Sequence, residues 1–93
     1  MKVKSKAKGD PKLSKEYRFA LRIMLDESEH LKYYDCRMSV GQMVDAFCKE
    51  KLIDSNGFKV QWDDTLIDIN MNDKIKELTK YGIDQGDTLL LFQ

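Results

Sequence analysis

The sequence predicts an α+β fold in which a mixed β-sheet carries one main helix across one face. Apolar and polar residues alternate over residues 17–25 and again over 58–62, which is typical of strands with one buried face. Residues 39–52 alone combine the start signal and the apolar spacing of a long amphipathic helix. Residues 88–92 are apolar at nearly every position, as expected for a strand in the middle of the sheet.

Length and composition limit the function classes. A chain of 93 residues with 42% hydrophobic and 34% charged residues fits one ordinary globular domain with a modest core. Its apolar runs are far shorter than the roughly 20 residues that cross a bilayer, so we expect no membrane role. Cys36 and Cys48 form neither a disulfide framework nor a zinc-binding pattern. We therefore expect a cytoplasmic, and in part also nuclear, protein without a metal or cofactor.

The first sixteen residues differ from the rest in charge. Residues 1–16 hold six lysines against two acidic residues, a net charge of +4, and the remainder has a net charge of −4. Gly9 and Pro11 interrupt this segment, and it contains few apolar side chains. We expect a flexible basic tail or linker at 1–16 and a folded domain at 17–93. Nucleic-acid binding is disfavoured, because the tail offers no aromatic side chain for base stacking and the net charge of the chain is zero.

The first folded segment, residues 17–38, has the pattern of a hairpin. Its first strand should bury the odd-numbered residues and direct Arg18 and Arg22 to solvent. Residues 26–29 are polar and predict the turn, which would leave His30 in solvent beside it. An extended segment then runs from Leu31 to Met38.

The helix has a specific start signal. Ser39 and Gln42 form a capping box, in which each side chain accepts a hydrogen bond from the backbone N–H of the other residue. Apolar residues then recur at the spacing of one helix face: Val40, Met43, Val44 and Phe47. Turn-forming residues at 54–57 end the segment.

The second half of the chain predicts shorter elements. Phe58, Val60 and Trp62 should face the core from a third strand, with Lys59 and Gln61 on its outer side. A turn at 63–64 and a short fourth strand at 65–67 follow, and one helical turn at 74–78 precedes the last strand at 88–92.

Two stretches of the chain carry a family resemblance. The segment from Tyr81 to Leu91, with Ile83 and the run from Thr88, resembles the end of ubiquitin. Residues 7–12, followed by Tyr17-Arg18-Phe19 and later by Ser39-Val40-Gly41, resemble the linker and C-terminal ubiquitin-like domain of arsenite-response AN-one-type zinc-finger proteins. The resemblance implies a ubiquitin-like β-grasp fold and an adaptor with zinc fingers upstream of this segment. It also implies docking onto the N-terminal domain of the valosin-containing AAA ATPase, and onto the proteasome, in stress-linked protein quality control.

The sequence departs from these patterns at three places. It ends at Phe92-Gln93 without Gly-Gly, so we expect a domain that is not conjugated to other proteins. The outer side of its third strand carries Lys59 and Gln61 where ubiquitin has an exposed isoleucine, which predicts poor binding to receptors that need a flat apolar patch. Related UBX domains pair a first-strand arginine with a Phe-Pro-Arg loop. Arg22 matches that arginine, but residues 62–65 contain neither proline nor arginine.

The residues that we predict to bind a partner are Arg18, Arg22, Lys59, Trp62 and Asp63. Two alternatives stay open: Trp62 at the edge of the core, and both arginines as solvated strand residues. No pattern indicates an enzyme, since nothing in the sequence orients Cys36 and His30 as a nucleophile and base. We therefore expect a monomeric interaction module. The alternative is a scaffold domain that binds a small GTPase through a sheet edge.

Overall fold

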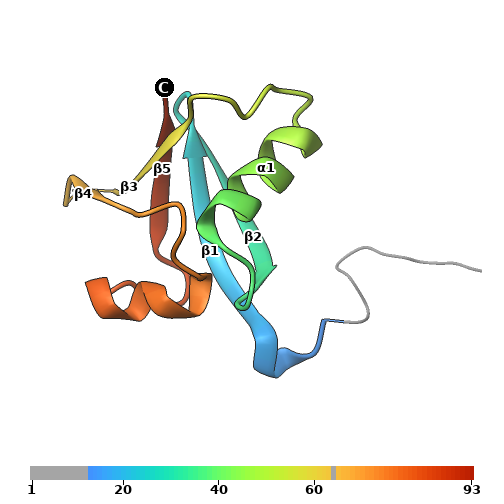
Figure 1. Ribbon diagram of the computed structural model, residues 1–93, viewed down its shortest axis with the longest axis vertical. Coiled ribbons are helices and arrows are strands. Elements are labelled where there is room, and N and C mark those ends of the chain that lie inside the picture. Colours follow the sequence, from blue (N-terminus) through green and yellow to red (C-terminus); the bar gives the residue numbers. More distant parts are fainter. Residues whose placement is uncertain (1–12, 64) are drawn as a thin grey trace, which may run out of the picture.

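The computed structural model describes residues 13–63 and 65–93, and its elements follow the predicted order (Figure 1). Of the predicted basic tail, residues 1–12 lie outside the described residues, so the boundary at residue 16 stays a prediction. A short 3-10 helix, η1 (Lys15–Tyr17), leads into the first strand. The described residues contain no helix that is long and apolar enough to cross a membrane.

The first two strands form a regular hairpin. β1 (Arg18–Leu25) pairs antiparallel with β2 (Ser28–Asp35) over all eight residues of each strand. The connecting turn consists of Asp26 and Glu27 alone, both with positive φ angles, as in the two-residue turns that follow the twist of a hairpin. The turn is therefore shorter than the predicted 26–29, and the prediction of His30 as a solvated turn residue is wrong. His30 lies within β2, half-buried, with its ring centroid 5.5 Å from that of Phe47.

The strands assemble in the order β2-β1-β5-β3-β4. β5 (Thr88–Phe92) lies in the middle, parallel to β1 and antiparallel to β3 (Lys59–Trp62). This position explains its apolar sequence, because a central strand is flanked on both sides and partly covered on both faces. β4 (Ile67–Asp68) is a two-residue strand beside β3, slightly later in the chain than the predicted 65–67.

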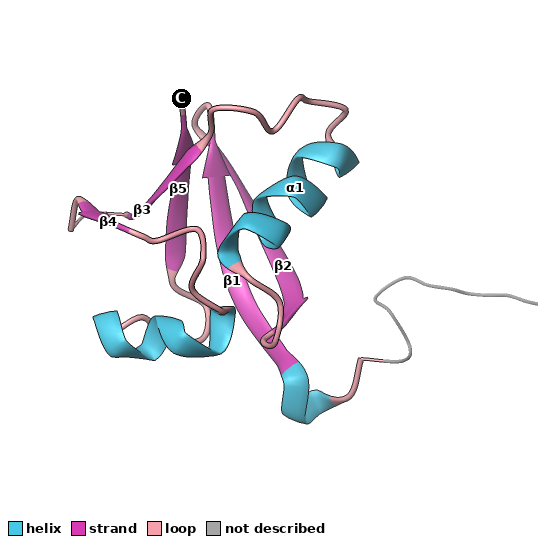
Figure 2. Cartoon of the chain, in the orientation of Figure 1, coloured by secondary structure: helices cyan, strands magenta, loops and turns pink. Residues whose placement is uncertain are grey.

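The helix α1 (Val40–Glu50) crosses one face of this sheet (Figure 2). The predicted capping box is present: the Ser39 N–H donates to Gln42 Oε1 at 2.8 Å, and the Gln42 N–H donates to Ser39 Oγ at 3.0 Å. At the other end, the Ile53 N–H donates to the Cys48 carbonyl and the Leu52 N–H to that of Lys49. These two hydrogen bonds form a Schellman motif, with Leu52 at the left-handed position that glycine usually occupies.

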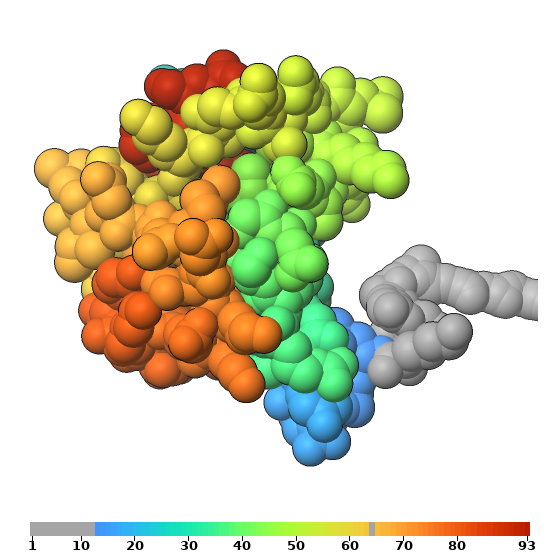
Figure 3. Space-filling model, in the orientation of Figure 1, coloured from blue at the N-terminus to red at the C-terminus, as the bar shows by residue number. Residues whose placement is uncertain are grey.

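The core lies between α1 and the sheet, with a contribution from the 3-10 helix η2 (Ile75–Tyr81). The space-filling view shows α1 and the segments around η2 covering most of this face (Figure 3). The predicted apolar faces meet here, and Ile75 and Leu78 of η2 are buried as expected. The largest of the fully buried side chains are those of Leu21, Ile23, Val40, Met43, Val44, Phe47, Val60, Ile75, Leu78, Ile83, Leu89 and Leu91.

Phe47 is the largest of these buried side chains and joins α1 to the sheet, so it provides a direct test of the core. We expect Phe47→Ala to lower the free energy of unfolding by about 3–5 kcal/mol, because it empties a buried aromatic site. Lys49→Ala, at an exposed position of the same helix, should change it by less than about 0.5 kcal/mol. Urea unfolding measures both values. A loss below about 1 kcal/mol for Phe47→Ala would contradict its place in the core.

Candidate interaction surface

The face of the sheet opposite α1 is not covered by any element of the described residues. We call it the open face, and it carries the even-numbered residues of β1 and the residues paired with them on the neighbouring strands. Its members are Arg18, Ala20, Arg22 and Met24 of β1, Glu29, Leu31, Tyr33 and Asp35 of β2, Thr88, Leu90 and Phe92 of β5, and Lys59 and Gln61 of β3.

Arg22 lies at the centre of the open face. Its cross-strand neighbours are Leu31 on β2 and Thr88 on β5. The guanidinium is 3.9 Å from Glu29, at the limit of an ion pair, and 45% of the side chain is exposed. Thr88 Oγ1 donates to the other Glu29 oxygen at 3.3 Å. Because an exposed pair at this distance contributes little stability, the guanidinium is available to a partner.

Apolar side chains surround this arginine. Leu31 and Tyr33 of β2 are 45% and 57% exposed, and Met24, Leu90 and Phe92 are partly buried on the other side of Arg22. The prediction of poor binding to receptors that need a flat apolar patch was based on the third strand alone, and the structure adds these apolar side chains from the neighbouring strands. Lys59 and Gln61 do lie on its outer side as predicted, but β1, β2 and β5 supply an apolar surface beside them.

A pocket continues the open face toward the turn of the hairpin. It has a volume of about 480 Å³ and is lined in part by Met24, Leu90, Phe92 and Phe58, with Asp26 and Glu27 at the turn. The apolar lining and the two carboxylates suit an apolar group with a basic neighbour.

At the opposite end of the hairpin, Arg37 holds the strand in place. It donates to both carboxylate oxygens of Asp35, at 2.9 and 2.7 Å, and its guanidinium lies 3.8 Å from the centre of the Tyr17 ring. These hydrogen bonds lower the pKa of Asp35 to about 2. The guanidinium of Arg18 lies 5.9 Å from the centre of the Tyr33 ring. This end of the hairpin therefore carries two arginines, and each lies beside a different tyrosine ring.

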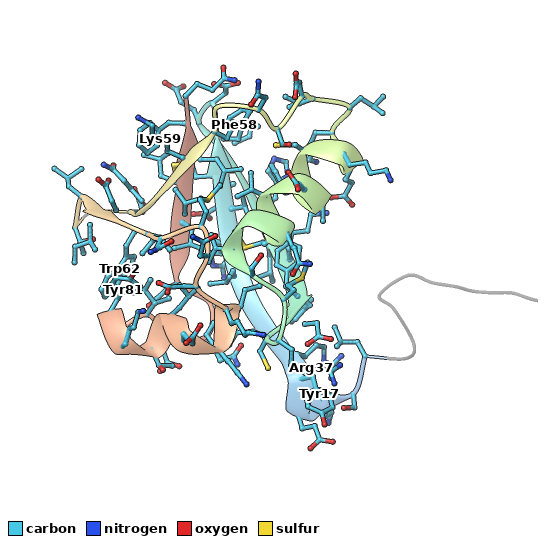
Figure 4. All side chains as sticks on the ribbon, in the orientation of Figure 1. Tyr17, Arg37, Phe58, Lys59, Trp62 and Tyr81 are labelled. Carbon is cyan, nitrogen blue, oxygen red and sulfur yellow. The ribbon has the colours of Figure 1, made fainter. Side chains whose placement is uncertain are left out.

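The predicted partner-binding residues do not form a single site. Arg18, Arg22 and Lys59 share the open face, with Lys59 opposite Phe92. Trp62 points to the opposite side, where it packs against the core, as the core-edge alternative proposed. Figure 4 shows Trp62 beside Tyr81 and η2, at the far end of β3 from Lys59. Asp63 begins the turn after β3, and its N–H donates to the Thr88 carbonyl at 3.1 Å.

His30 and Cys36, which the sequence analysis considered as a nucleophile and base, lie far apart in the structure. His30 packs its ring against Phe47, and Cys36 follows the end of β2, where its N–H donates to the Tyr17 carbonyl. Six residues of extended chain separate their backbones by roughly 20 Å. They therefore do not form a nucleophile and base pair.

Comparison with known proteins finds similar folds among solved structures but no match by sequence. No model of a protein family matches the sequence, and no curated protein matches it either. Among solved structures, one titled as molecular mimicry of SUMO that promotes DNA repair aligns with a TM-score of 0.70 and 10% identity, over 83% of this chain and 92% of that chain. Ubiquitin from Caldiarchaeum subterraneum aligns with a TM-score of 0.62 and 14% identity, over 80% and 90% of the two chains.

The fold is a ubiquitin-like β-grasp. This agrees with the prediction from sequence, since a mixed sheet with one main helix is the arrangement of these neighbours. A third match is ATBAG1, solved in complex with HSP70, with a TM-score of 0.63 and 13% identity, over 81% of this chain and 40% of that chain. The resemblance to one zinc-finger family stays a prediction.

Trp62 also fixes the loop before the central strand of the β-grasp. Gly82 has a φ of +99°, and a Cβ there would lie 3.3 Å from the Trp62 ring. Gly57 has a φ of +86°, and a Cβ at that position would meet no other atom within 4 Å. The two glycines thus share a backbone conformation and differ in their surroundings.

We expect both Gly57→Ala and Gly82→Ala to destabilise the domain by about 1–2 kcal/mol through the left-handed backbone. Gly82→Ala should lose at least about 1 kcal/mol more, because the new methyl group displaces the packed Trp62 ring. Urea unfolding followed by the fluorescence of Trp62, the single tryptophan of the chain, measures both. Equal losses would contradict the packing of Trp62 on this loop.

Proposed function

We propose that this domain is a ubiquitin-like interaction module that binds a protein partner through the open face. The observation that carries the proposal is the position of Arg22. Its guanidinium lies at the centre of an exposed sheet face, and among the described residues its one ion pair is that with Glu29, at 3.9 Å. Leu31 and Tyr33 lie on one side of it, and Met24 and Leu90 on the other. An arginine inside an apolar surface is a common composition for a binding hot spot.

The partner that we propose is the N-terminal domain of the valosin-containing AAA ATPase. Two features support it: the sequence resemblance to the zinc-finger adaptors, and the first-strand arginine that matches the docking arginine of UBX domains. In this proposal the domain brings the ATPase and the proteasome to the substrates of a longer zinc-finger adaptor in the cytoplasm or nucleus.

The contact would rely on the sheet face more than on the loop after β3. That turn contains no proline or arginine, and the Thr65 hydroxyl folds back to donate to the Trp62 carbonyl at 2.8 Å. Lys59 lies at the far side of the open face, beside Phe92, and would contribute at the rim of the contact.

We expect Arg22→Ala to weaken binding to the isolated N-terminal domain of the ATPase by about 2 kcal/mol, which is more than tenfold in affinity. Arg22→Lys should restore only part of the loss, because an ammonium cannot reproduce the planar fork of a guanidinium. Titration calorimetry measures these affinities, and the urea midpoint of each variant shows that the fold is retained.

Lys59→Ala should weaken binding less than Arg22→Ala, as expected for a rim position, and Lys49→Ala on α1 should have no effect. If the domain and the N-terminal domain of the ATPase do not bind at high micromolar concentration, the proposed partner is wrong. Equal affinity of the unchanged chain and Arg22→Ala would contradict the proposal that Arg22 contacts the ATPase.

A further inference from the structure

The outer edge of β2 offers a second kind of contact. Within residues 13–63 and 65–93, β2 pairs with β1 alone and lies at the end of the sheet. It is eight residues long and contains no proline, glycine or bulge, the features that usually protect an edge strand from pairing with another chain. Its central charged side chain, Lys32, turns away to the helix side, where its Nζ lies 2.6 Å from Glu50.

Hydrogen bonds elsewhere in the hairpin show which backbone groups face outward. The Cys36 N–H donates to the Tyr17 carbonyl, so the odd-numbered residues of β1 bond to β2. The Arg22 N–H donates to the Asp87 carbonyl, so the even-numbered residues of β1 bond to the segment of β5. By the register of the hairpin, the even-numbered residues of β2 bond to β1. Glu29, Leu31 and Tyr33 therefore direct both backbone groups outward.

At the next odd-numbered position, only the N–H is available, because the Asp35 carbonyl accepts from the Met38 N–H at 3.0 Å. Leu31 and Tyr33 are also the residues of β2 whose apolar side chains are exposed on the open face. A strand added at this edge would hydrogen-bond to Leu31 and Tyr33 and place its own opposing side chains against them. The helix side of β2 is closed by the Lys32–Glu50 pair and by His30 packed on Phe47.

Charge varies along this edge and distinguishes its two ends. The turn end carries Asp26, Glu27 and Glu29, and within the described part of the chain Glu29 alone of these three has an ion pair, with Arg22. The other end carries Arg18 and Arg37, and Arg37 neutralises Asp35. The edge therefore runs from an acidic end through an apolar centre to a basic end.

We infer that the β2 edge binds an extended segment of another protein as an additional antiparallel strand. Because such a strand runs opposite to β2, its N-terminal end meets the arginines and its C-terminal end meets the acidic turn. The segment should thus have an acidic residue first, then two apolar residues separated by one position, then a basic residue. This contact uses the outward backbone groups of β2 and does not depend on the ATPase.

Two peptides of identical composition test the inference on the full chain. The first is acetyl-Glu-Thr-Thr-Thr-Val-Thr-Val-Thr-Lys-amide, in which the valines fall opposite Tyr33 and Leu31 and the lysine opposite Glu29. The second has the reversed order, from Lys to Glu. The first should bind at least about threefold more tightly, because cross-strand charge pairs favour it at both ends. Equal affinities, or tighter binding of the reversed peptide, would overturn the charge assignment.

Amide hydrogen exchange locates the added strand. Binding of the first peptide should slow exchange at the outward amides of Leu31 and Tyr33, and leave Lys32 and Tyr34, already bonded to β1, unchanged. Unchanged exchange at Leu31 and Tyr33 with millimolar peptide would overturn the inference.

Variants separate this edge from the open face. Tyr33→Pro removes an outward N–H and none of the bonds to β1, so it should abolish peptide binding, and Tyr33→Thr, which keeps the N–H, should retain part of it. If Tyr33→Pro does not fold, the inference is tested by amide exchange at Leu31 and Tyr33 in the unchanged chain alone. Lys49→Ala, on the exposed side of α1, should leave peptide affinity within about twofold. Because the peptide measurement contains no ATPase, a failure of the ATPase proposal would not affect this result.

Discussion

One helix can bury only one face of a five-stranded sheet, and most features of this domain follow from that limit. α1 lies across the inner face, where the odd-numbered residues of β1 meet Val40, Met43 and Phe47 in the core. The capping box at Ser39 fixes where the helix begins, and with it the position of Phe47 over the sheet. The alternation of side chains in each strand then determines what remains outside. The second face is exposed because no element of the described residues is left to cover it.

The composition of that exposed face suits binding better than simple solvation. A sheet face that only met water would carry polar side chains, as an antiparallel strand with one wet face normally does. Here Leu31 and Tyr33 are exposed beside Arg22, and a pocket of about 480 Å³ lies at the hairpin-turn end of the sheet, near Phe92. The neighbouring edge of β2 adds backbone groups that no other strand of the described residues pairs with. The two contacts share the side chains of Leu31 and Tyr33. They differ in that the face contact depends on Arg22 and the edge contact on the outward backbone groups of β2, so separate measurements test the two proposals.

The sequence predicts the fold well because its signals are local. Alternation in β1 and β3, the Ser39–Gln42 capping box and the apolar run of β5 each depend on neighbouring residues, and the structure confirms all of them. The turn at Asp26-Glu27 was predicted too long, because a tight turn with positive φ at two acidic residues lacks the usual Asn-Gly signal. The candidate surface was only partly predictable. Arg18, Arg22 and Lys59 follow from alternation within one strand, but the apolar surface around them depends on how β2, β1 and β5 align, which no single segment specifies.

The central claim is that the open face, and not the helix face, meets the ATPase. The most direct measurement is the change in backbone amide chemical shifts of the isotope-labelled chain when the unlabelled N-terminal domain of the ATPase is added. The account predicts that the largest changes cluster at Arg22, Leu31 and Leu90, while Asp45 and Lys49 on the exposed side of α1 stay unchanged. Changes concentrated on α1, with Arg22 and its neighbours unaffected, would contradict the account.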